Sequence, residues 1–500
     1  MTSIPFQSQR LIPPRSIQHS FQPLRIASVP LVIVLALWAF SPNSIGLLAI
    51  TCAFVLTLMP WWSYTVWRQG DLRRFPLFSI VSSMYVIAYV LPLFLGSNLG
   101  KTSFGPRVLA PDAIDNTMLL AVIGVLALGV GIALRLPDGF ATQWKLEFSD
   151  KALTWNYVRL VFMGASALAF TLGIGALGQG GRQAMVDLES VVVIAAFLAL
   201  YRRFLRGQSE RLDQILLAGY VVLCIGKGVA SGWLGAAVWF VIEIGVCYFD
   251  VRRRVPKLVM VIVVVAILFL QPGKDALRGR YWHGIGNSVG TSSERAKYWV
   301  DASVSAWSQA VERPEERSKL FGQTLSRVSL FEPTAMVMQM TPTQVPYQNG
   351  RLYKYFFVTL IPRAIWPNKP SFSGANQFYQ VAYGITDRRD LGKVSMAVGS
   401  LAESYINFGW FGPPLVMFVI GLVLNVVRRY FLDADQGEFL RSLGIALLPS
   451  LMIIESQAVQ YLAGIIQAVV LTVVIFLPAL QVARAGVKRF PAVQPARGII

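Results

Sequence analysis

The feature that most constrains this chain is a series of apolar blocks, each about 17–22 residues long and separated by charged segments, which is the length an α-helix needs to cross a bilayer. Hydrophobic residues make up 55% of the 500 residues and charged residues 14%, whereas about a quarter of a soluble globular protein is charged. An ordinary soluble enzyme and a disordered chain are therefore excluded, and 3 Cys are too few for a disulfide scaffold. The sequence predicts an all-α polytopic membrane protein.

Charged segments divide the chain into five parts. We expect a cytoplasmic N-terminal tail over residues 1–23, a bundle of about nine transmembrane helices over 24–271, and a large external loop over 272–410. About three further helices follow over 411–482, and residues 483–500 form a cytoplasmic C-terminal tail. The expected total is about twelve membrane spans.

Loop charge sets the expected orientation. With both termini in the cytoplasm, the cytoplasmic segments hold 25 of the 45 Lys and Arg residues and the short external loops hold four, as the positive-inside rule requires. Much of the net charge of +19 is thus explained by the cytoplasmic segments of a membrane protein, and we expect no nucleic-acid partner. The loop 272–410 holds 16 Lys and Arg against 10 Asp and Glu. It either binds an anionic partner or is a solvated face, and its residues 294–311 have the apolar spacing of an amphipathic helix.

The entrance to this loop carries a group of cations. Pro272 is suited to the first position of a short helix, and Lys274 and Arg278 then lie four residues apart on one helical face, with Arg280 just beyond. These cations lie at the expected membrane boundary, where a lipid diphosphate would sit, and arginine matches phosphate oxygens bidentately. The alternative is that they bind lipid head groups or snorkel. A neutral His283 beside them is a candidate base, although a lone histidine is more often structural.

A proline-rich segment, residues 361–370, forms the second landmark of the loop. Three prolines exclude a helix interior and predict a rigid elbow that holds Arg363 and Lys369 beside Trp366. An indole face stacks on a sugar ring, and the neighbouring cations suit phosphate or hydroxyl groups. A turn that proline merely stiffens explains the prolines but not the pairing of arginine with tryptophan.

The third landmark is the segment that enters the next span, residues 399–412. Glu403 and Asn407 lie four residues apart in an otherwise apolar stretch, and an ionisable group at the membrane boundary is a functional candidate because it is expensive to bury. The alternative is a structural salt bridge between Glu403 and Arg363 or another loop cation. The chain has no phosphate-binding glycine loop and no zinc-binding helix motif, so we expect no nucleotide cofactor and no metal.

These features resemble the bacterial O-antigen and oligosaccharide repeat-unit polymerases, the Wzy-type membrane proteins. The likeness lies in the many spans, one large external loop late in the chain, and the segments GKDALRGRYW (273–282), LIPRAIWPNKP (360–370) and GSLAESYINFGWFG (399–412). The resemblance implies a GT-C-like glycosyltransferase in the bacterial inner membrane, with its large loop in the periplasm or outside the cell. Such an enzyme polymerises undecaprenyl diphosphate-linked repeat units into O-antigen, capsule or exopolysaccharide, without metal or nucleotide sugar.

The resemblance also implies roles for the residues already singled out. A sugar diphosphate is already activated, so its departure mainly requires neutralisation of charge; this role falls to Lys274, Arg278, Arg280 and Arg363. His283 or Glu403 would take the proton of the acceptor hydroxyl. The remaining substrate contacts are assigned to Trp366, Lys369 and Asn407. The implied partners are the lipid-linked donor and acceptor glycans, the bilayer, a chain-length regulator and a flippase.

Three other functions stay open from the sequence. An O-antigen ligase performs similar chemistry on a different acceptor. A polysaccharide exporter or flippase needs a polar pathway through many helices, whereas intramembrane ionisable residues are few here, Glu243 and Lys227 being the clearest. A non-catalytic scaffold of an envelope assembly machine would tolerate replacement of its loop cations.

Overall fold

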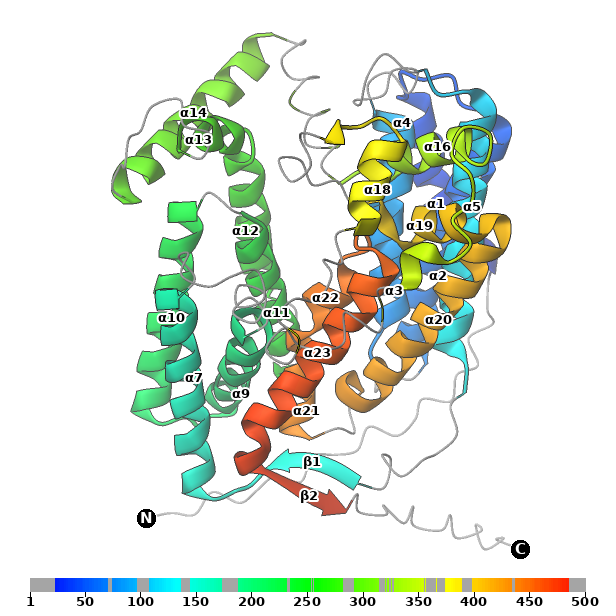
Figure 1. The fold of residues 1–500 in the computed structure, drawn as a ribbon. Helices are drawn as coiled ribbons and strands as arrows, with labels where there is room; N and C mark the ends of the chain where they lie inside the picture. Colours follow the sequence, from blue (N-terminus) through cyan, green and yellow to red (C-terminus); the bar gives the residue numbers. More distant parts are fainter. Residues whose placement is uncertain are drawn as a thin grey trace, which may run out of the picture.

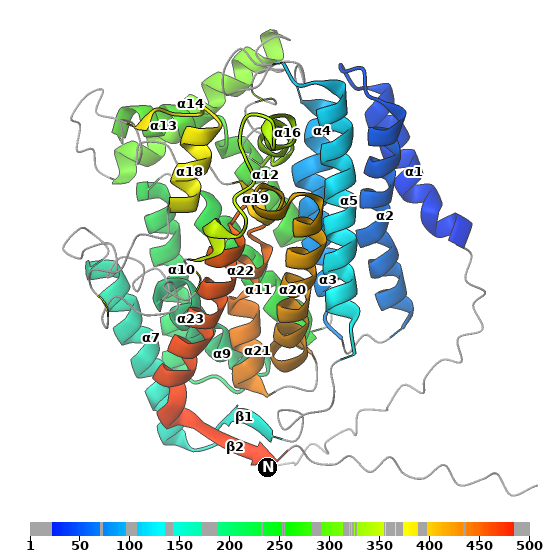
Figure 2. The same cartoon turned by 45° about the vertical axis from the view of Figure 1, so that its right-hand side comes forward.

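The computed structural model of the chain describes residues 23–70, 74–96, 108–135, 144–172, 188–231, 234–252, 254, 256–281, 292–313, 320, 322, 325, 328–354, 356, 366, 374–388, 398–433 and 437–484. Helices dominate these ranges (Figure 1), and the strands that they contain, β1 (Trp144–Phe148) and β2 (Leu480–Arg484), pair in one antiparallel ribbon. We call the end of the molecule that carries this ribbon the sheet end, and the opposite end, which carries α13, α14, α16 and α18, the cap end (Figures 1 and 2).

Five helical segments in the described ranges are long and apolar enough to cross a membrane, namely Leu47–Gln69, Leu77–Leu95, Pro111–Ala133, Gly399–Leu432 and Ala458–Ala479. The shortest has 19 residues and is therefore about 28 Å long, close to the roughly 30 Å thickness of the hydrocarbon core. This result confirms an α-helical protein that suits a membrane. Five of the about twelve expected spans are thus found in the part of the chain that the structure describes.

These segments are built from shorter elements. The first and third are α2 (Leu47–Gln69) and α5 (Pro111–Ala133). The second consists of α3 (Leu77–Tyr85), the π-helix η1 (Val86–Val90) and α4 (Leu91–Leu95), and the fifth of α23 (Ala458–Phe476) and η7 (Leu477–Ala479). The fourth consists of α19 (Gly399–Phe408), η5 (Gly409–Phe411), α20 (Gly412–Val427) and the π-helix η6 (Arg428–Leu432). The fourth segment begins at Gly399, although the sequence placed the start of this span at residue 411. Gly409, at φ +59°, ends α19, but the 3-10 turn η5 lets the chain continue directly into α20.

Helices α5 and α20 pack closely together because glycines lie at their contact. A Cβ atom added to Gly421 would lie 2.4 Å from the Leu128 carbonyl oxygen, and one added to Gly131 would lie 2.5 Å from the Phe418 carbonyl oxygen. Without side chains at these positions the two backbones approach closely, as is common between membrane helices. Asn425 then donates to the Leu134 carbonyl at 2.7 Å, which satisfies an orphan carbonyl at the end of α5.

A second group of helices lies on the other side of the molecule from α1 (Pro23–Ala39), α2 and α5 (Figure 1). It contains α7 (Ala152–Leu172), the π-helix η2 (Leu188–Val193), α9 (Ile194–Leu205), α10 (Arg211–Ser231), α11 (Leu234–Arg252) and α12 (Lys257–Leu270). Aromatic rings join these helices: Phe197 of α9 lies 5.5 Å from Tyr220 of α10 and 5.1 Å from Phe240 of α11, between ring centroids. The short helices α21 (Glu438–Ala446) and α22 (Leu448–Met452) connect this group to the five spans.

The cap end is formed by α13 (Gly273–Tyr281), α14 (Ser292–Glu312), α16 (Phe331–Met340), the 3-10 helix η3 (Arg351–Lys354) and α18 (Gly374–Ala382). Helix α14 confirms the helix predicted over residues 294–311. A short helix, α13, follows as expected, but it begins at Gly273, so Pro272 directly precedes the helix and does not occupy its first position. The indole N–H groups of Trp299 and Trp307 donate to the carbonyls of Leu270 and Phe269 at 2.8 and 3.0 Å. These bonds fix α14 across the end of α12.

Candidate functional site

The structure describes only some of the predicted site residues. His283, Arg363 and Lys369 lie outside the described residues, and Arg278 lies in α13 with its side chain outside them as well. Lys274 and Arg280 also lie in α13. The first is half-buried, and the second is exposed with its guanidinium 4.5 Å from the centre of the Tyr298 ring. Trp366, whose neighbours lie outside the described residues, is 41% exposed.

Glu403 and Asn407 are the two predicted site residues that the structure brings together. They lie about one turn apart on the same face of α19, and both side chains are buried. Helix α19 packs against α5, α16, α20 and α23, whereas α13 packs against α14. The cations of α13 and the carboxyl group of α19 therefore lie in different groups of packed helices (Figure 2).

The carboxyl group of Glu403 is held by the start of another helix. Its residue is 2% exposed, and its Oε2 accepts a hydrogen bond from the backbone N–H of Ala458 at 2.7 Å. Ala458 is the first residue of α23, where unsatisfied N–H groups and the helix dipole both favour negative charge. Neither a hydrogen-bond donor nor a cation among the described residues pairs with Oε1, the other oxygen. Within the described residues Glu403 thus binds the backbone and forms no ion pair, while Arg363, the cation named for the alternative salt bridge, lies outside them.

The start of α19 is fixed to the same turn that precedes α23. The N–H of Gly399 donates to the Glu455 carbonyl at 3.0 Å, and the Ser400 hydroxyl donates to the Ser456 carbonyl at 3.0 Å. Gly399 adopts φ +75°, a conformation that favours glycine. These bonds position Glu403 rigidly, because both the helix that carries it and the helix that binds it are held at one turn.

Asn407 connects α19 to the segment that contains η3. Its Nδ2 donates to the Glu403 carbonyl at 2.9 Å, and its Oδ1 accepts from the Leu352 N–H at 3.4 Å. Its carbonyl accepts from the Asn349 N–H at 3.0 Å. The side chain and backbone of Asn407 thereby tie η3 to α19, which is a role that differs from the substrate contact predicted for it.

The residues of η3 are the part of the site that the sequence did not reveal. Tyr353 stacks on Phe408 with ring centroids 5.8 Å apart, and it lies close enough to Glu403 for the two groups to interact electrostatically. Its hydroxyl oxygen is buried and has no hydrogen-bond partner within the described residues. On either side of it, Arg351 and Lys354 are exposed. No spacing of residues in the sequence identifies this segment as part of the site, because backbone hydrogen bonds to residues 406 and 407 hold it against α19.

The site therefore contains two buried polar atoms without a hydrogen-bond partner among the described residues, Glu403 Oε1 on α19 and the Tyr353 hydroxyl on η3. Two exposed cations, Arg351 and Lys354, also lie on η3. Buried polar atoms without partners are rare and call for an explanation. A buried carboxylate oxygen can accept a proton from a hydroxyl group of a substrate. Across the described ranges, no three His, Cys, Asp or Glu side chains gather closely enough to hold a metal ion.

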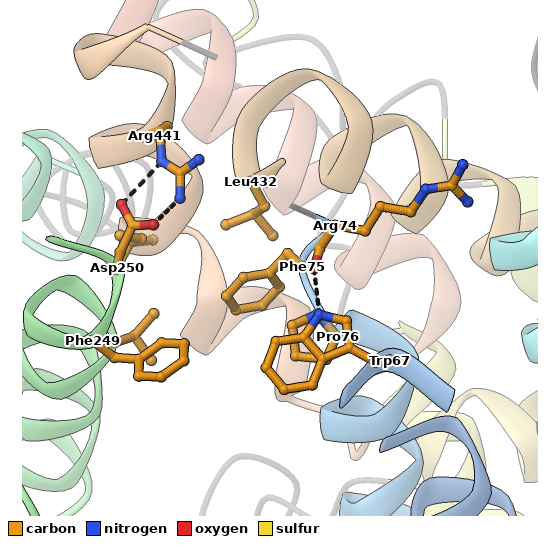
Figure 3. Close-up of a pocket in the computed structure, with 10 residues that line it drawn as sticks. Trp67, Arg74, Phe75, Pro76, Phe249, Asp250, Leu432 and Arg441 are labelled. Atoms are coloured by element: carbon orange, nitrogen blue, oxygen red, sulfur yellow. Dashed lines mark hydrogen bonds and ion pairs between the residues drawn. The ribbon is translucent and has the colours of Figure 1, made fainter. Parts of the chain in front are cut away.

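A separate pocket lies at the sheet end, away from this site. Figure 3 shows the ion pair of Asp250 with Arg441 on one wall and Trp67, Phe75 and Arg74 on the other. The indole of Trp67 donates to the Arg74 carbonyl at 2.6 Å. The charged residues of the lining, Arg74, Asp250 and Arg441, all interact with other residues of the protein. The rest of the lining is apolar. None of the predicted site residues lines it.

Comparisons with known proteins place the chain in a family. No curated protein and no solved structure matches it. A family model described as a domain of unknown function, DUF8712, matches residues 101–432. This match covers well over half of the 500 residues and includes α19 with Glu403. The chain therefore belongs to the DUF8712 family.

Proposed function

We propose that this protein is a membrane glycosyltransferase that polymerises undecaprenyl diphosphate-linked repeat units on the outer face of the bacterial inner membrane. The observation that carries the proposal is Glu403, a buried carboxyl group with one oxygen fixed by the N-terminus of α23 and the other without a partner in the described residues. It lies in a helical segment long enough to cross a membrane, directly after the cationic region 272–398. Such a position suits a substrate whose lipid lies in the bilayer and whose glycan lies above it.

The chemistry needs one base and one region of positive charge. The acceptor hydroxyl gives its proton to Glu403 Oε1, and its oxygen forms a bond to the anomeric carbon of the donor sugar. The bond from that carbon to the diphosphate breaks, and the lipid diphosphate leaves with the electron pair. Base catalysis of this kind contributes about 10²–10⁴-fold to a rate, and fixed cations stabilise the departing charge. The Tyr353 hydroxyl would donate to an oxygen of the reacting sugars.

Arg351 and Lys354 are the described cations best placed to bind the diphosphate, because η3 is tied to α19. Lys274, Arg278 and Arg280, on α13, would bind phosphate or sugar groups at the part of the cap end that α13 and α14 form. The roles predicted for Arg363, Trp366 and Lys369 in the proline-rich segment remain part of the proposal. His283 remains the alternative base.

Deletion of the gene tests the proposal in cells. Loss of a polymerase leaves single repeat units on the lipid carrier and on the surface, which gel sizing of the glycans detects. Long glycans that accumulate on the carrier without reaching their final acceptor would instead identify a ligase, and repeat units trapped on the cytoplasmic side would identify a flippase. Unchanged glycan length and location would rule out all three.

A further inference from the structure

Helix α14 lies across the cap end of the second helix group. It contacts α10, α12 and α13, and Figures 1 and 2 show it running crosswise over the ends of α10 and α12. The hydrogen bonds from the Trp299 and Trp307 indoles to the carbonyls of Leu270 and Phe269 fix the middle of α14 on the last turn of α12. Helix α14 therefore lies at the level where α12 ends.

One side of α12 is apolar and exposed along the helix. The side chains that form it recur every three or four positions, and they are Leu258, Val261, Ile262, Val265 and Leu268. A protein surface in water rarely carries so continuous an apolar stripe, whereas the hydrocarbon core of a bilayer accepts it. The last turn of α12, and α14 with it, therefore lies where this helix leaves the bilayer.

Helix α14 itself carries large apolar side chains that the protein leaves exposed. Val300, Val304 and Val311 are 44, 47 and 83% exposed, and Trp307 is exposed as well. We call these four residues the outer apolar face, because spacings of four, three and four residues place them on one side of the helix. The indole of Trp307 also reaches the end of α12. The outer apolar face thus adjoins the side of α14 that meets α12, and it lies along the boundary of the bilayer.

The opposite side of α14 is polar. Asp301, Ser305 and Glu312 are exposed, and with 3.6 residues per turn they lie about half a turn away from the side that Trp299 and Trp307 turn toward α12. A helix with apolar side chains toward the lipid and polar side chains toward water is suited to lie in a membrane interface. Tryptophan is also enriched at this depth, because its ring is apolar and its N–H is polar.

We propose that α14 is an interfacial helix whose outer apolar face inserts into the phospholipid leaflet at the cap end. Apolar contact provides the affinity, because α14 carries three acidic and two basic residues and so has no net attraction for anionic lipids. Helix α13, which packs on α14, then holds Lys274 and Arg280 at the level of the lipid head groups. This contact is separate from Glu403 and does not depend on the function proposed for that residue.

Nitroxide labels on introduced cysteines test this placement in the full-length protein in phosphatidylcholine vesicles. Collisions with oxygen, which concentrates in lipid, and with a water-soluble nickel chelate report the surroundings of each label. Val304→Cys and Val311→Cys should give a several-fold higher ratio of oxygen to nickel collisions than their neighbours Ser305→Cys and Glu312→Cys. Val265→Cys, on the exposed side of α12, should give a higher ratio still. Phosphatidylglycerol added to the vesicles should leave the ratios on α14 unchanged.

Two controls keep the comparison clean. The labelled protein without an introduced cysteine gives the signal from Cys52, Cys224 and Cys247, which is subtracted. If Val304→Cys does not accumulate, Val300→Cys and Asp301→Cys form an equivalent pair of neighbours.

Three outcomes would overturn the proposal. If labels at 304 and 311 meet the nickel chelate as often as those at 305 and 312, the outer apolar face lies in water. If labels at 304 and 311 meet neither reagent, another part of the protein or a second copy covers this face. A high oxygen ratio that requires phosphatidylglycerol would show that charge, and not apolar contact, holds α14 to the membrane.

Discussion

Buried acids at the sheet end and buried acids elsewhere in the bundle are held in different ways. At the sheet end, Asp250 is shared by Arg202 and Arg441, and Glu438 binds Arg202 at 2.8 Å and Arg206 at 2.6 Å. Glu403 and Glu243, in contrast, have no cation partner within the described residues.

This difference distinguishes acids that stabilise the fold from the acid to which we assign a function. A buried carboxylate with two guanidinium partners repays much of its desolvation cost, and removing one partner leaves an uncompensated charge. A buried carboxyl group without a cation has no such compensation, and a protein that retains it has another use for it. We therefore expect substitutions at the sheet end to reduce stability, and substitutions at Glu403 to reduce activity.

The largest effect is expected for Glu403→Gln. Glutamine keeps an oxygen that can accept the Ala458 N–H but cannot take up the acceptor proton, so the rate of glycan extension should fall about 10²–10⁴-fold. The measurement is the extension rate of lipid-linked repeats by purified protein. The matched control is Glu455→Gln, an exposed acid in the turn before α23, which should keep the wild-type rate. Wild-type activity in Glu403→Gln would place the base elsewhere, with His283 as the next residue to replace.

Asp250→Asn should give the largest loss of stability. It removes the charge that Arg202 and Arg441 share, and breaking a buried pair of this kind costs about 3–5 kcal/mol. Thermal unfolding in detergent should therefore begin at a clearly lower temperature than for the wild type. Asp301→Asn, at an exposed position of α14, should leave the unfolding temperature unchanged. An unchanged value for Asp250→Asn as well would remove the structural role that we assign to the paired acids.

A smaller change in activity is expected for Tyr353→Phe. The hydroxyl has no partner within the described residues, so its removal should not lower the unfolding temperature. A hydrogen bond to an uncharged sugar oxygen contributes about 0.5–1.5 kcal/mol, so kcat/KM should fall about two- to tenfold. A variant with normal activity, or one that unfolds earlier, would show that Tyr353 acts only in packing.

The smallest effect concerns pH and Glu438. Burial alone would raise the pKa of this acid, but the hydrogen bond and charge of Arg202, together with Arg206, hold the pKa below its ordinary value of 4.5. A lowered folded-state pKa stabilises the protein above pH 4.5, and that stabilisation is lost as the pH falls through the folded-state pKa. The unfolding temperature should thus drop with acidification below pH 4.5, and less steeply in Glu438→Gln. Equal slopes for the two proteins would contradict the role of this ion pair.

The sequence predicted the elements better than their arrangement. The apolar block of α5 and the amphipathic spacing of α14 were both found as expected, because each depends on neighbours within the same helix. The cations of α13 and the acid of α19 were expected in one site, but α13 is held to α14, across the end of α12. Contacts of this kind join residues far apart in the chain, and no local pattern reports them.

The candidate site shows the same limit. The spacing of Glu403 and Asn407 was sufficient to place both on one helical face, and the cost of burying an acid marked Glu403. The neighbouring Tyr353 was missed because Gly350, at φ +80°, and backbone bonds to α19 bring it there. The binding of Glu403 to a helix N-terminus was missed for a related reason, since α23 begins more than fifty residues later.

The most direct test of the account uses purified protein in phospholipid vesicles, supplied with undecaprenyl diphosphate-linked repeat units and a metal chelator. Mass spectrometry of the lipid-linked glycans reports their length. We predict that they grow by whole repeat units, with release of undecaprenyl diphosphate. Glycans that keep their original length, in a preparation whose protein is folded and inserted, would contradict the proposed transferase.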